Sequence, residues 1–138
     1  MAEDITLRVI TPDEIVLDTT AESVRVPGVD GSLGILRRHA SMVTALEAGD
    51  LSYTQNGREE HLFIGEGFAE VRDNTIRVVA DASERPTDID VERATKSAER
   101  ARERLKSRQA DGPSDFDALR AQAALRRAMQ RLRMSNRN

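Results

Sequence analysis

The segment LSYTQNGREEHLFI, residues 51–64, has the pattern of two strands joined by a tight turn. Asn56-Gly57 lies between the runs Leu51–Thr54 and His61–Ile64. A type I′ turn needs positive φ at both central residues, which Asn and Gly tolerate better than other residues. The segment therefore predicts a β-hairpin, with His61 packed as an ordinary strand residue.

Further strand patterns extend from this hairpin in both directions. Residues 5–10 alternate with period two, and Asp73-Asn74 separates two more apolar runs in the manner of a second hairpin. Such alternation between turn signals is typical of strands that bury one face. Residues 1–84 are therefore expected to form a β-sandwich domain of about eight to ten strands.

The pattern becomes helical after Ala80. Residues 88–109 contain neither Gly nor Pro, and Thr87 or Asp88 is placed to cap a helix there. Gly112-Pro113 ends that helix, and Ser114 with an acid three residues later resembles the start of a second. Residues 85–138 are therefore expected to form an antiparallel helical hairpin.

The two expected helices present faces made mostly of alanine. These faces comprise Ala94, Ala98, Ala101 and Leu105 on the first helix and Ala118, Ala121, Leu125, Ala128, Met129 and Leu132 on the second. A buried alanine contributes one methyl group, about 0.8 kcal/mol, against an ordering cost of about 1–2 kcal/mol per residue. The hairpin is therefore expected to be weakly held and movable.

The composition excludes several classes of protein. The 138 residues include no Cys, no Trp and two His, which excludes disulfides and thiolate metal sites and leaves little for general-base chemistry. No apolar run is long enough to span a bilayer, and no nucleotide-binding or hydrolase motif is present, so a soluble chain without metal or catalytic residues is expected.

The net charge of −3 hides two halves of opposite sign. Residues 1–84 hold 7 Arg and 16 acidic residues, a balance of −9, whereas residues 85–138 hold 14 basic and 8 acidic residues, a balance of +6. Two rows of arginine share spacings of seven and four residues: Arg93, Arg100 and Arg104, and Arg120, Arg127 and Arg131. The rows form either a solvated face with ion pairs or a site for a polyanion.

Four segments carry a family resemblance. They are Gly31–Leu36 followed by His39, Gly65–Val71, Asp88–Ala94 and Leu125–Leu132. In this order, and with the sandwich followed by the hairpin, the chain resembles the epsilon subunits of F-type ATP synthases over nearly its whole length. The rival interpretations are a nucleic-acid-binding module that uses the basic hairpin and, less favoured, a small β-sandwich enzyme.

The resemblance implies a non-catalytic subunit of the central stalk that helps couple proton flow to ATP synthesis. The sandwich would bind the gamma subunit and the polar loops of the c ring, and it would not bind nucleic acid. The hairpin would regulate: folded, it leaves the motor free, and extended into the alpha/beta catalytic hexamer, it obstructs ATP hydrolysis. The chain would sit on the cytoplasmic face of a bacterial membrane, attached through the complex.

The resemblance also implies a regulatory ATP site and no other cofactor. Ile89–Ala94 matches the family motif I/L-D-x-x-R-A, with Asp90, Arg93 and Ala94 at fixed positions. The full candidate set is Val79, Glu84, Ile89, Asp90, Arg93, Ala94, Arg120, Arg127 and Arg131, with adenine near Val79, Ile89 and Asp90 and phosphates near the arginines. Asp90 serves equally well as a first-turn acid that favours the helix dipole.

The chain departs from the family in the loop expected to contact partners. Ser32 stands where relatives commonly carry Glu, and Arg37-Arg38-His39 stands within a run where relatives carry prolines. Ser32, Arg37, Arg38 and His39 are the candidate partner contacts. This surface is therefore expected to be more positive than in relatives.

Overall fold

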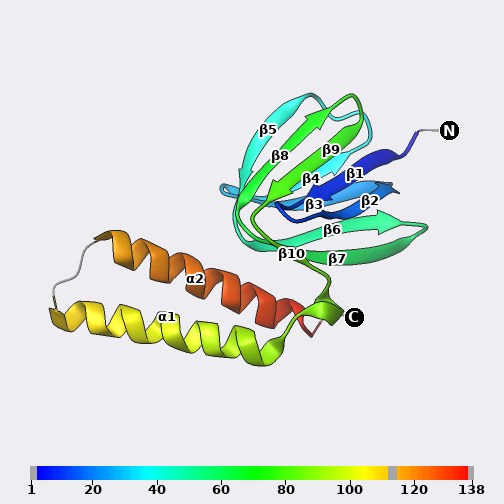
Figure 1. The fold of residues 1–138 in the computed structure, drawn as a ribbon. Helices are drawn as coiled ribbons and strands as arrows, with labels where there is room; N and C mark the ends of the chain where they lie inside the picture. Colours follow the sequence, from blue (N-terminus) through cyan, green and yellow to red (C-terminus); the bar gives the residue numbers. More distant parts are fainter. Residues whose placement is uncertain (1–2, 112–114, 137–138) are drawn as a thin grey trace. The chain divides into compact units, whose positions relative to one another are not determined.

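The computed structural model describes residues 3–111 and 115–136, with side chains described outside 108–116. The chain divides into two compact units, residues 1–85 and 86–138. Figure 1 shows strands throughout the first unit and two long helices in the second.

Within the described residues of the first unit, ten strands form one sheet. Their bounds are β1 Ile5–Ile10, β2 Ile15–Ala21, β3 Ser23–Gly28, β4 Gly31–Leu36, β5 Met42–Leu46, β6 Gly49–Gln55, β7 Arg58–Ile64, β8 Gly67–Arg72, β9 Thr75–Ala80 and β10 Ser83–Glu84. The order is β10-β7-β6-β3-β5-β8-β9-β1-β2, with β4 paired to β3. The pairs are antiparallel except β1 with β9. The sheet folds over into two layers, which confirms the β-sandwich of eight to ten strands.

Alternating side chains build the core between the layers. In β1, Ile5, Leu7 and Val9 are buried, whereas Arg8 between them is exposed. The same alternation places Ile76 and Val78 of β9 in the core. Because side chains of successive strand residues point to opposite faces, this alternation decides which residues fill the sandwich.

The two turns expected from sequence have the required backbone. Asn56 and Gly57 have φ of 52° and 75°, and Asp73 and Asn74 have φ of 49° and 59°. Each pair connects neighbouring antiparallel strands, β6 to β7 and β8 to β9. Both hairpin predictions are confirmed, with the positive φ values that type I′ turns need.

Gly67 is required by close packing at the start of β8. A Cβ atom on Gly67 would collide with the carbonyl oxygen of Val79 and lie 2.8 Å from Cα of Ala80, on the paired strand β9. Backbone atoms cannot yield as a side chain can. Only glycine therefore allows β8 and β9 to approach this closely.

The second unit starts with the 3₁₀ turn η1 (Pro86–Asp88) and continues into α1 (Val91–Asp111) and α2 (Asp115–Met134). The cap of α1 is Asp90, whose Oδ1 accepts from the N–H of Arg93 at 3.0 Å. The sequence prediction of Thr87 or Asp88 was wrong, because both residues belong to η1, which precedes the cap. The expected stop and restart at residues 112–114 lie outside the described residues.

An alanine seam joins α1 and α2. It consists of Ala94, Ala98, Ala101, Ala118, Ala121 and Ala128, all buried. Leu105, Leu125 and Leu132 are half-buried at its borders. Met129, expected within the apolar face, is 45% exposed and lies beside the seam, with its Sδ 3.1 Å from Nη2 of Arg102. The two-helix hairpin is confirmed, with a narrower seam than the sequence predicts.

Candidate functional site

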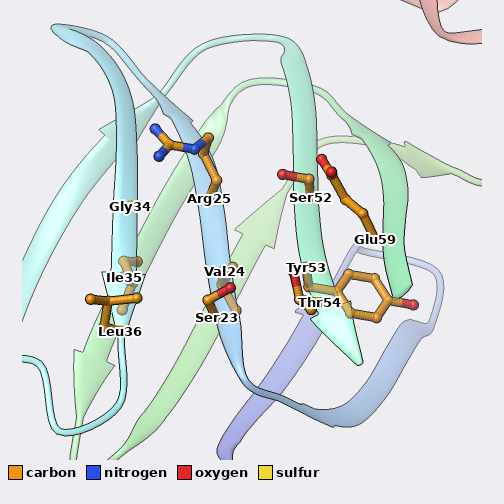
Figure 2. Close-up of a pocket in the computed structure, with 10 residues that line it drawn as sticks. All are labelled: Ser23, Val24, Arg25, Gly34, Ile35, Leu36, Ser52, Tyr53, Thr54 and Glu59. Atoms are coloured by element: carbon orange, nitrogen blue, oxygen red, sulfur yellow. The ribbon is translucent and has the colours of Figure 1, made fainter. Parts of the chain in front are cut away.

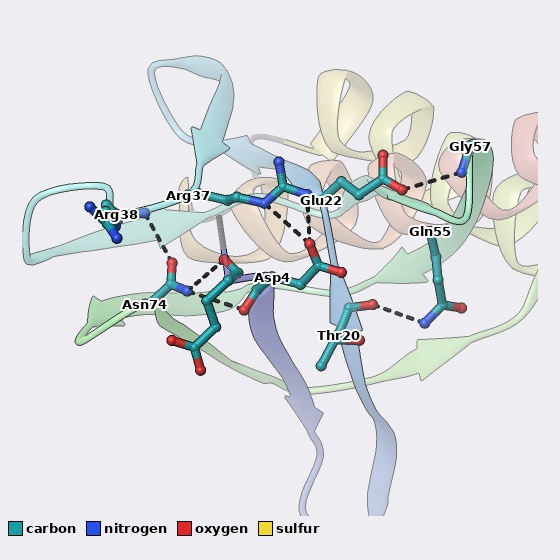
Figure 3. Close-up of polar contacts among 9 residues, drawn as sticks. Asp4, Thr20, Glu22, Arg37, Arg38, Gln55, Gly57 and Asn74 are labelled. Carbon is teal, nitrogen blue, oxygen red and sulfur yellow. Dashed lines mark hydrogen bonds and ion pairs between the residues drawn. The ribbon is translucent and has the colours of Figure 1, made fainter. Parts of the chain in front are cut away.

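The segment after β4 contains three of the candidate partner contacts. Arg37 forms an ion pair with Asp4, with Nη2 2.6 Å and Nε 3.2 Å from Oδ1 (Figure 3). The backbone N–H of Arg38 donates to Oδ1 of Asn74 at 2.9 Å, and Nδ1 of His39 donates to the carbonyl of Ala40 at 2.7 Å. The contacts of Arg37 with Asp4 and of Arg38 with Asn74 thus fix this segment to the sandwich.

These contacts change the charge expected from the sequence. Asp4 neutralises Arg37, whereas the side chain of Arg38 is exposed on a residue with φ of 60°. Asn74 also donates from Nδ2 to the carbonyls of Glu3 and Asp4, which fixes the start of β1 beside this segment. The expected positive surface is therefore concentrated at Arg38.

An apolar row that the sequence did not predict lies on the outer face of the sheet. Its members are cross-strand partners: Ala45 with Phe68, Phe68 with Val79, Val79 with Ile10, and Ile10 with Ile15. Phe68 is 44% exposed and Ile15 60% exposed, and Val43, diagonal to Phe68 on β5, is 68% exposed. The sequence signal for this row is that apolar residues occupy strand positions at which alternation predicts polar, outward-facing ones.

A shallow polar groove lies on another part of the sheet, across β3, β4, β6 and β7. Its volume is about 240 Å³, and Figure 2 shows the ten residues that line it. Arg25, Ser52 and Glu59 contribute polar atoms, and Gly34 forms part of the floor. Burial raises the pKa of Tyr53 at this groove, Glu60 raises it further, and Arg85 opposes both effects.

His61 is bonded more specifically than an ordinary strand residue. Its Nδ1 lies 3.0 Å from Oδ1 of Asp50, and its Nε2 lies 3.5 Å from Oε1 of Glu59. His61 is in β7 as expected. Glu59 is two residues earlier on the same strand, whereas Asp50 on β6 reaches His61 only through the β6–β7 register, which the sequence could not show. Among the described residues, no group of three or more His, Cys, Asp or Glu gathers as a metal site.

Two of the candidate nucleotide residues at the start of α1, Asp90 and Arg93, line an open hollow. It has a volume of about 350 Å³ and is lined by Asp90, Glu92, Arg93, Lys96 and Arg100. Nζ of Lys96 pairs with Oε1 of Glu92 at 3.1 Å, and three cations border the hollow in all. Such a set of donors suits a phosphate-bearing ligand, while one oxygen of Asp90 is committed to the cap.

The arginines of α2 differ in their level along the hairpin. Arg93 lies 18 residues before the end of α1, whereas Arg131, Arg127 and Arg120 lie 16, 12 and 5 residues after the start of α2. At about 1.5 Å per residue, Arg131 is nearly level with Arg93, Arg127 is about 9 Å away in level and Arg120 about 20 Å. Arg131 is therefore best placed to act together with Arg93, whereas Arg120 is far from Arg93 along the helix axis.

The remaining candidates divide between the two units. Ile89 and Ala94 are buried in the second unit. Val79 and Glu84 belong to the first unit, where Val79 is half-buried in β9 and Glu84 ends β10. In the described part of the chain, no helix is long and apolar enough to cross a membrane.

Comparisons with known proteins agree along the whole chain. Residues 4–86 match the family model described as ATP synthase, Delta/Epsilon chain, beta-sandwich domain, and residues 87–136 match the corresponding long alpha-helix domain. The chain is 46% identical over 108 residues to an ATP synthase epsilon chain of Carboxydothermus hydrogenoformans, covering 78% of this chain and 81% of that one. It is 42% identical over 105 residues to that of Nitratidesulfovibrio vulgaris strain Hildenborough, covering 76% and 78%.

A solved structure is similar in fold. A chain in the mitochondrial ATP synthase OSCP/F1/c-ring assembly of Euglena gracilis superposes with a TM-score of 0.76 at 23% identity, covering 92% of this chain and 78% of that one. The fold, the two family models and the relatives lead to one assignment. The chain belongs to the ATP synthase delta/epsilon chain family, a family of non-catalytic subunits of that complex.

Proposed function

We propose that this chain is the epsilon subunit in the central stalk of an F-type ATP synthase. In this role the sandwich binds the gamma subunit and rests on the c ring, so that it turns with them and helps couple proton flow to ATP synthesis. Family membership supports this role, and so does the position of the neighbour from Euglena gracilis within an F1/c-ring assembly.

The apolar row is the observation that carries the proposal. A row of exposed and half-buried apolar side chains that crosses β5, β8, β9, β1 and β2 in register is more than scattered surface residues. Contiguous exposed apolar patches in folded proteins mark interaction surfaces. The gamma subunit is the partner we assign to this row, because a partner that stays bound through rotation needs an apolar contact.

We assign contact with the c ring to a second surface, which consists of Ser32 near the β3–β4 turn and Arg38 after β4. Ser32 lies beside the β3–β4 turn and is exposed, and Arg38 presents an exposed guanidinium. Hydroxyl and guanidinium groups suit the polar loops of a membrane-embedded ring. The chain then lies on the cytoplasmic face of a bacterial membrane as a peripheral part of the complex.

The helical hairpin is proposed to regulate ATP hydrolysis. Apart from Met134, the buried side chains described in α1 and α2 are alanines, so the closed form is stabilised modestly and a partner can shift it toward an open form. In the open form the basic α2 enters the alpha/beta hexamer and obstructs hydrolysis. ATP, bound by Asp90, Arg93 and Arg131 with Arg127 nearby, favours the closed form, since it adds contacts that only the closed hairpin offers.

Introduction of a negative charge into the apolar row tests the central assignment. Phe68→Glu and Val43→Glu should each reduce co-purification with the gamma subunit by at least about tenfold, while the melting temperature stays near that of wild type because both side chains are exposed. Leu119→Glu is the matched control, since Leu119 is 64% exposed on α2, outside the row. Wild-type binding by Phe68→Glu would remove the assignment.

The regulatory role has a separate test in the assembled motor. Arg127→Ala should increase ATP hydrolysis with little effect on synthesis, because each lost charge-assisted contact costs about 1.5–3 kcal/mol. Arg133→Ala is the matched control from α2, since Arg133 is exposed and belongs to neither arginine row. Equal hydrolysis in wild type and Arg127→Ala, with assembly intact, would show that α2 is only a solvated face.

A further inference from the structure

β4 is an edge strand that pairs on one side only. Its six residues, Gly31–Leu36, pair with Ser23–Gly28 of β3, and no other described strand pairs with β4. The two ends of the main strand path differ from it. β10 has two residues, and β2 is bonded to β6 through Gln55, whose Nε2 donates to Thr19 and Thr20.

The β3–β4 hairpin decides which backbone groups of β4 face the open side. Two residues, Val29 and Asp30, connect the strands, so the flanking Gly28 and Gly31 form a hydrogen-bonded pair. Hydrogen-bonded and non-hydrogen-bonded pairs alternate along an antiparallel ladder. The N–H and C=O groups of Ser32 and Gly34 therefore point away from β3, toward the open edge.

β4 lacks the features that usually protect an exposed edge. Its sequence, GSLGIL, contains no charged residue and no proline, and Leu36 is 67% exposed. Natural edge strands are commonly blocked by inward-pointing charges, proline or bulges. An unblocked six-residue edge is a template on which an extended polypeptide can form backbone hydrogen bonds.

A positive side chain lies next to this edge. Arg25 of β3 is directly opposite Gly34, and a Cβ atom on Gly34 would be 3.4 Å from Nη2 of Arg25. The guanidinium thus extends over the space that a side chain at position 34 would occupy (Figure 2). Its Nη1 donates to Oγ of Ser32 at 3.2 Å, and no carboxylate among the described residues pairs with Arg25.

We propose that β4 accepts an extended segment of a partner polypeptide by strand addition, and that a carboxylate side chain of this segment binds Arg25 across Gly34. The backbone groups of Ser32 and Gly34 supply the main-chain bonds, and exposed Leu36 supplies an apolar contact. This surface is separate from the apolar row. It shares Ser32 and Arg38 with the surface assigned above to the c ring, and the strand-addition proposal does not rest on that assignment.

The charge of the site selects the occupant. A second copy of this chain would bring another β4, which has no acidic residue, and would place arginine near arginine. The exposed side chain of Arg38, which follows β4 closely in the chain, adds positive charge at the same end of the strand. An acidic segment therefore fits better than self-pairing.

The test uses the full chain labelled with ¹⁵N and the synthetic peptide acetyl-TVDVT-amide. In an extended TVDVT peptide, Asp and both threonines lie on the outer face and both valines lie on the core side. This matches β4, in which Gly34 and Leu36 face outward and Leu33 and Ile35 face inward. We expect the amide signals of Ser32 and Gly34 to shift at peptide concentrations up to about 5 mM. Absence of these shifts would overturn strand addition.

Matched variants separate the backbone contact from the charge contact. Arg25→Gln in the protein, or TVNVT in place of TVDVT, should each weaken binding at least about fivefold. Arg77→Gln, at an exposed in-strand position on β9, should bind as wild type, and the dispersion of each ¹⁵N spectrum reports folding. Two peptides methylated on alternate backbone nitrogens complete the test. Only the peptide whose methyl groups replace the N–H groups that face β4 should lose binding. Equal binding of TVDVT and TVNVT, or equal binding of both methylated peptides, would refute the proposal.

Discussion

The backbone N–H of Arg93 donates to the side-chain carboxylate of Asp90 at 3.0 Å, so the two fixed polar residues of the candidate nucleotide motif also start α1. Asp90 is therefore both the cap of α1 and a candidate ATP contact, and substitution by alanine would remove both at once. A loss of ATP binding in a variant without the cap could reflect a frayed helix rather than a lost ligand contact.

A pair of substitutions at Asp90 separates these roles. Asn keeps a side-chain oxygen that caps a helix about as well as Asp, whereas Ala removes the cap at a cost of about 1 kcal/mol. We expect Asp90→Ala to lower the melting temperature of the hairpin and Asp90→Asn to leave it nearly unchanged. Far-UV circular dichroism during heating measures both. If Asp90 is only a cap, calorimetric titration with ATP will give the same affinity for Asp90→Asn and wild type.

The ion pair between Arg37 and Asp4 should contribute little to stability. Their side chains are 35% and 44% exposed, so solvent screens the pair despite its short distance. A double-mutant cycle with Arg37→Ala and Asp4→Ala should yield a coupling energy of about 0.5 kcal/mol that decreases as salt is added. A coupling well above about 1 kcal/mol would mean that the pair is structurally essential.

Substitution of Gly67 should be severe. The added methyl group of Gly67→Ala meets backbone atoms of β9, so we expect a loss of about 3 kcal/mol and a melting temperature lower by roughly 15 °C. Gly34→Ala is the control, because its methyl group meets only the mobile Arg25 side chain at 3.4 Å and should cost less than about 0.5 kcal/mol. Equal melting of the two variants would contradict the packing described for β8 and β9.

Tyr53 provides a direct measurement of burial. Since the chain has one tyrosine, its ultraviolet absorbance titration reports this residue alone. Burial raises the pKa of Tyr53 in the folded state, so the folded protein holds the proton to higher pH than the unfolded chain does. Stability should therefore be complete below a pH of about 10 and decrease as pH rises through the folded pKa.

The same titration in urea supplies the reference. The unfolded chain should show the ordinary tyrosine value, and Tyr53→Phe should remove this alkaline part of the stability profile. A folded titration that coincides with the unfolded one would mean that the ring is open to solvent.

The extent of sequence-based prediction depended on how local the deciding interaction is. Asn56-Gly57 needs only its own backbone preference, so the hairpin could be read directly. The cap could not, because Thr87, Asp88 and Asp90 all have capping side chains and the choice depends on where η1 ends. The contact of Arg37 with Asp4 joins residues 33 positions apart, which no local pattern encodes.

The apolar row shows the same limit on a larger scale. Phe68, Val79 and Ile10 come from three strands, and they become neighbours only through the registers of β8, β9 and β1. Each residue alone is an unremarkable exception to alternation. The parallel pairing of β1 with β9, which brings the first strand beside the ninth, is the step that sequence periodicity does not reveal.

The alanine seam has a consequence for how α1 and α2 recognise each other. Alanine has no side-chain rotamer to order and projects no knob that fits one hole better than the next, so the seam encodes little information about register. The side chains at its borders, the half-buried leucines and Arg102 beside Met129, are then expected to define the pairing. The register between α1 and α2 should accordingly depend on these few border contacts more than on the alanines themselves.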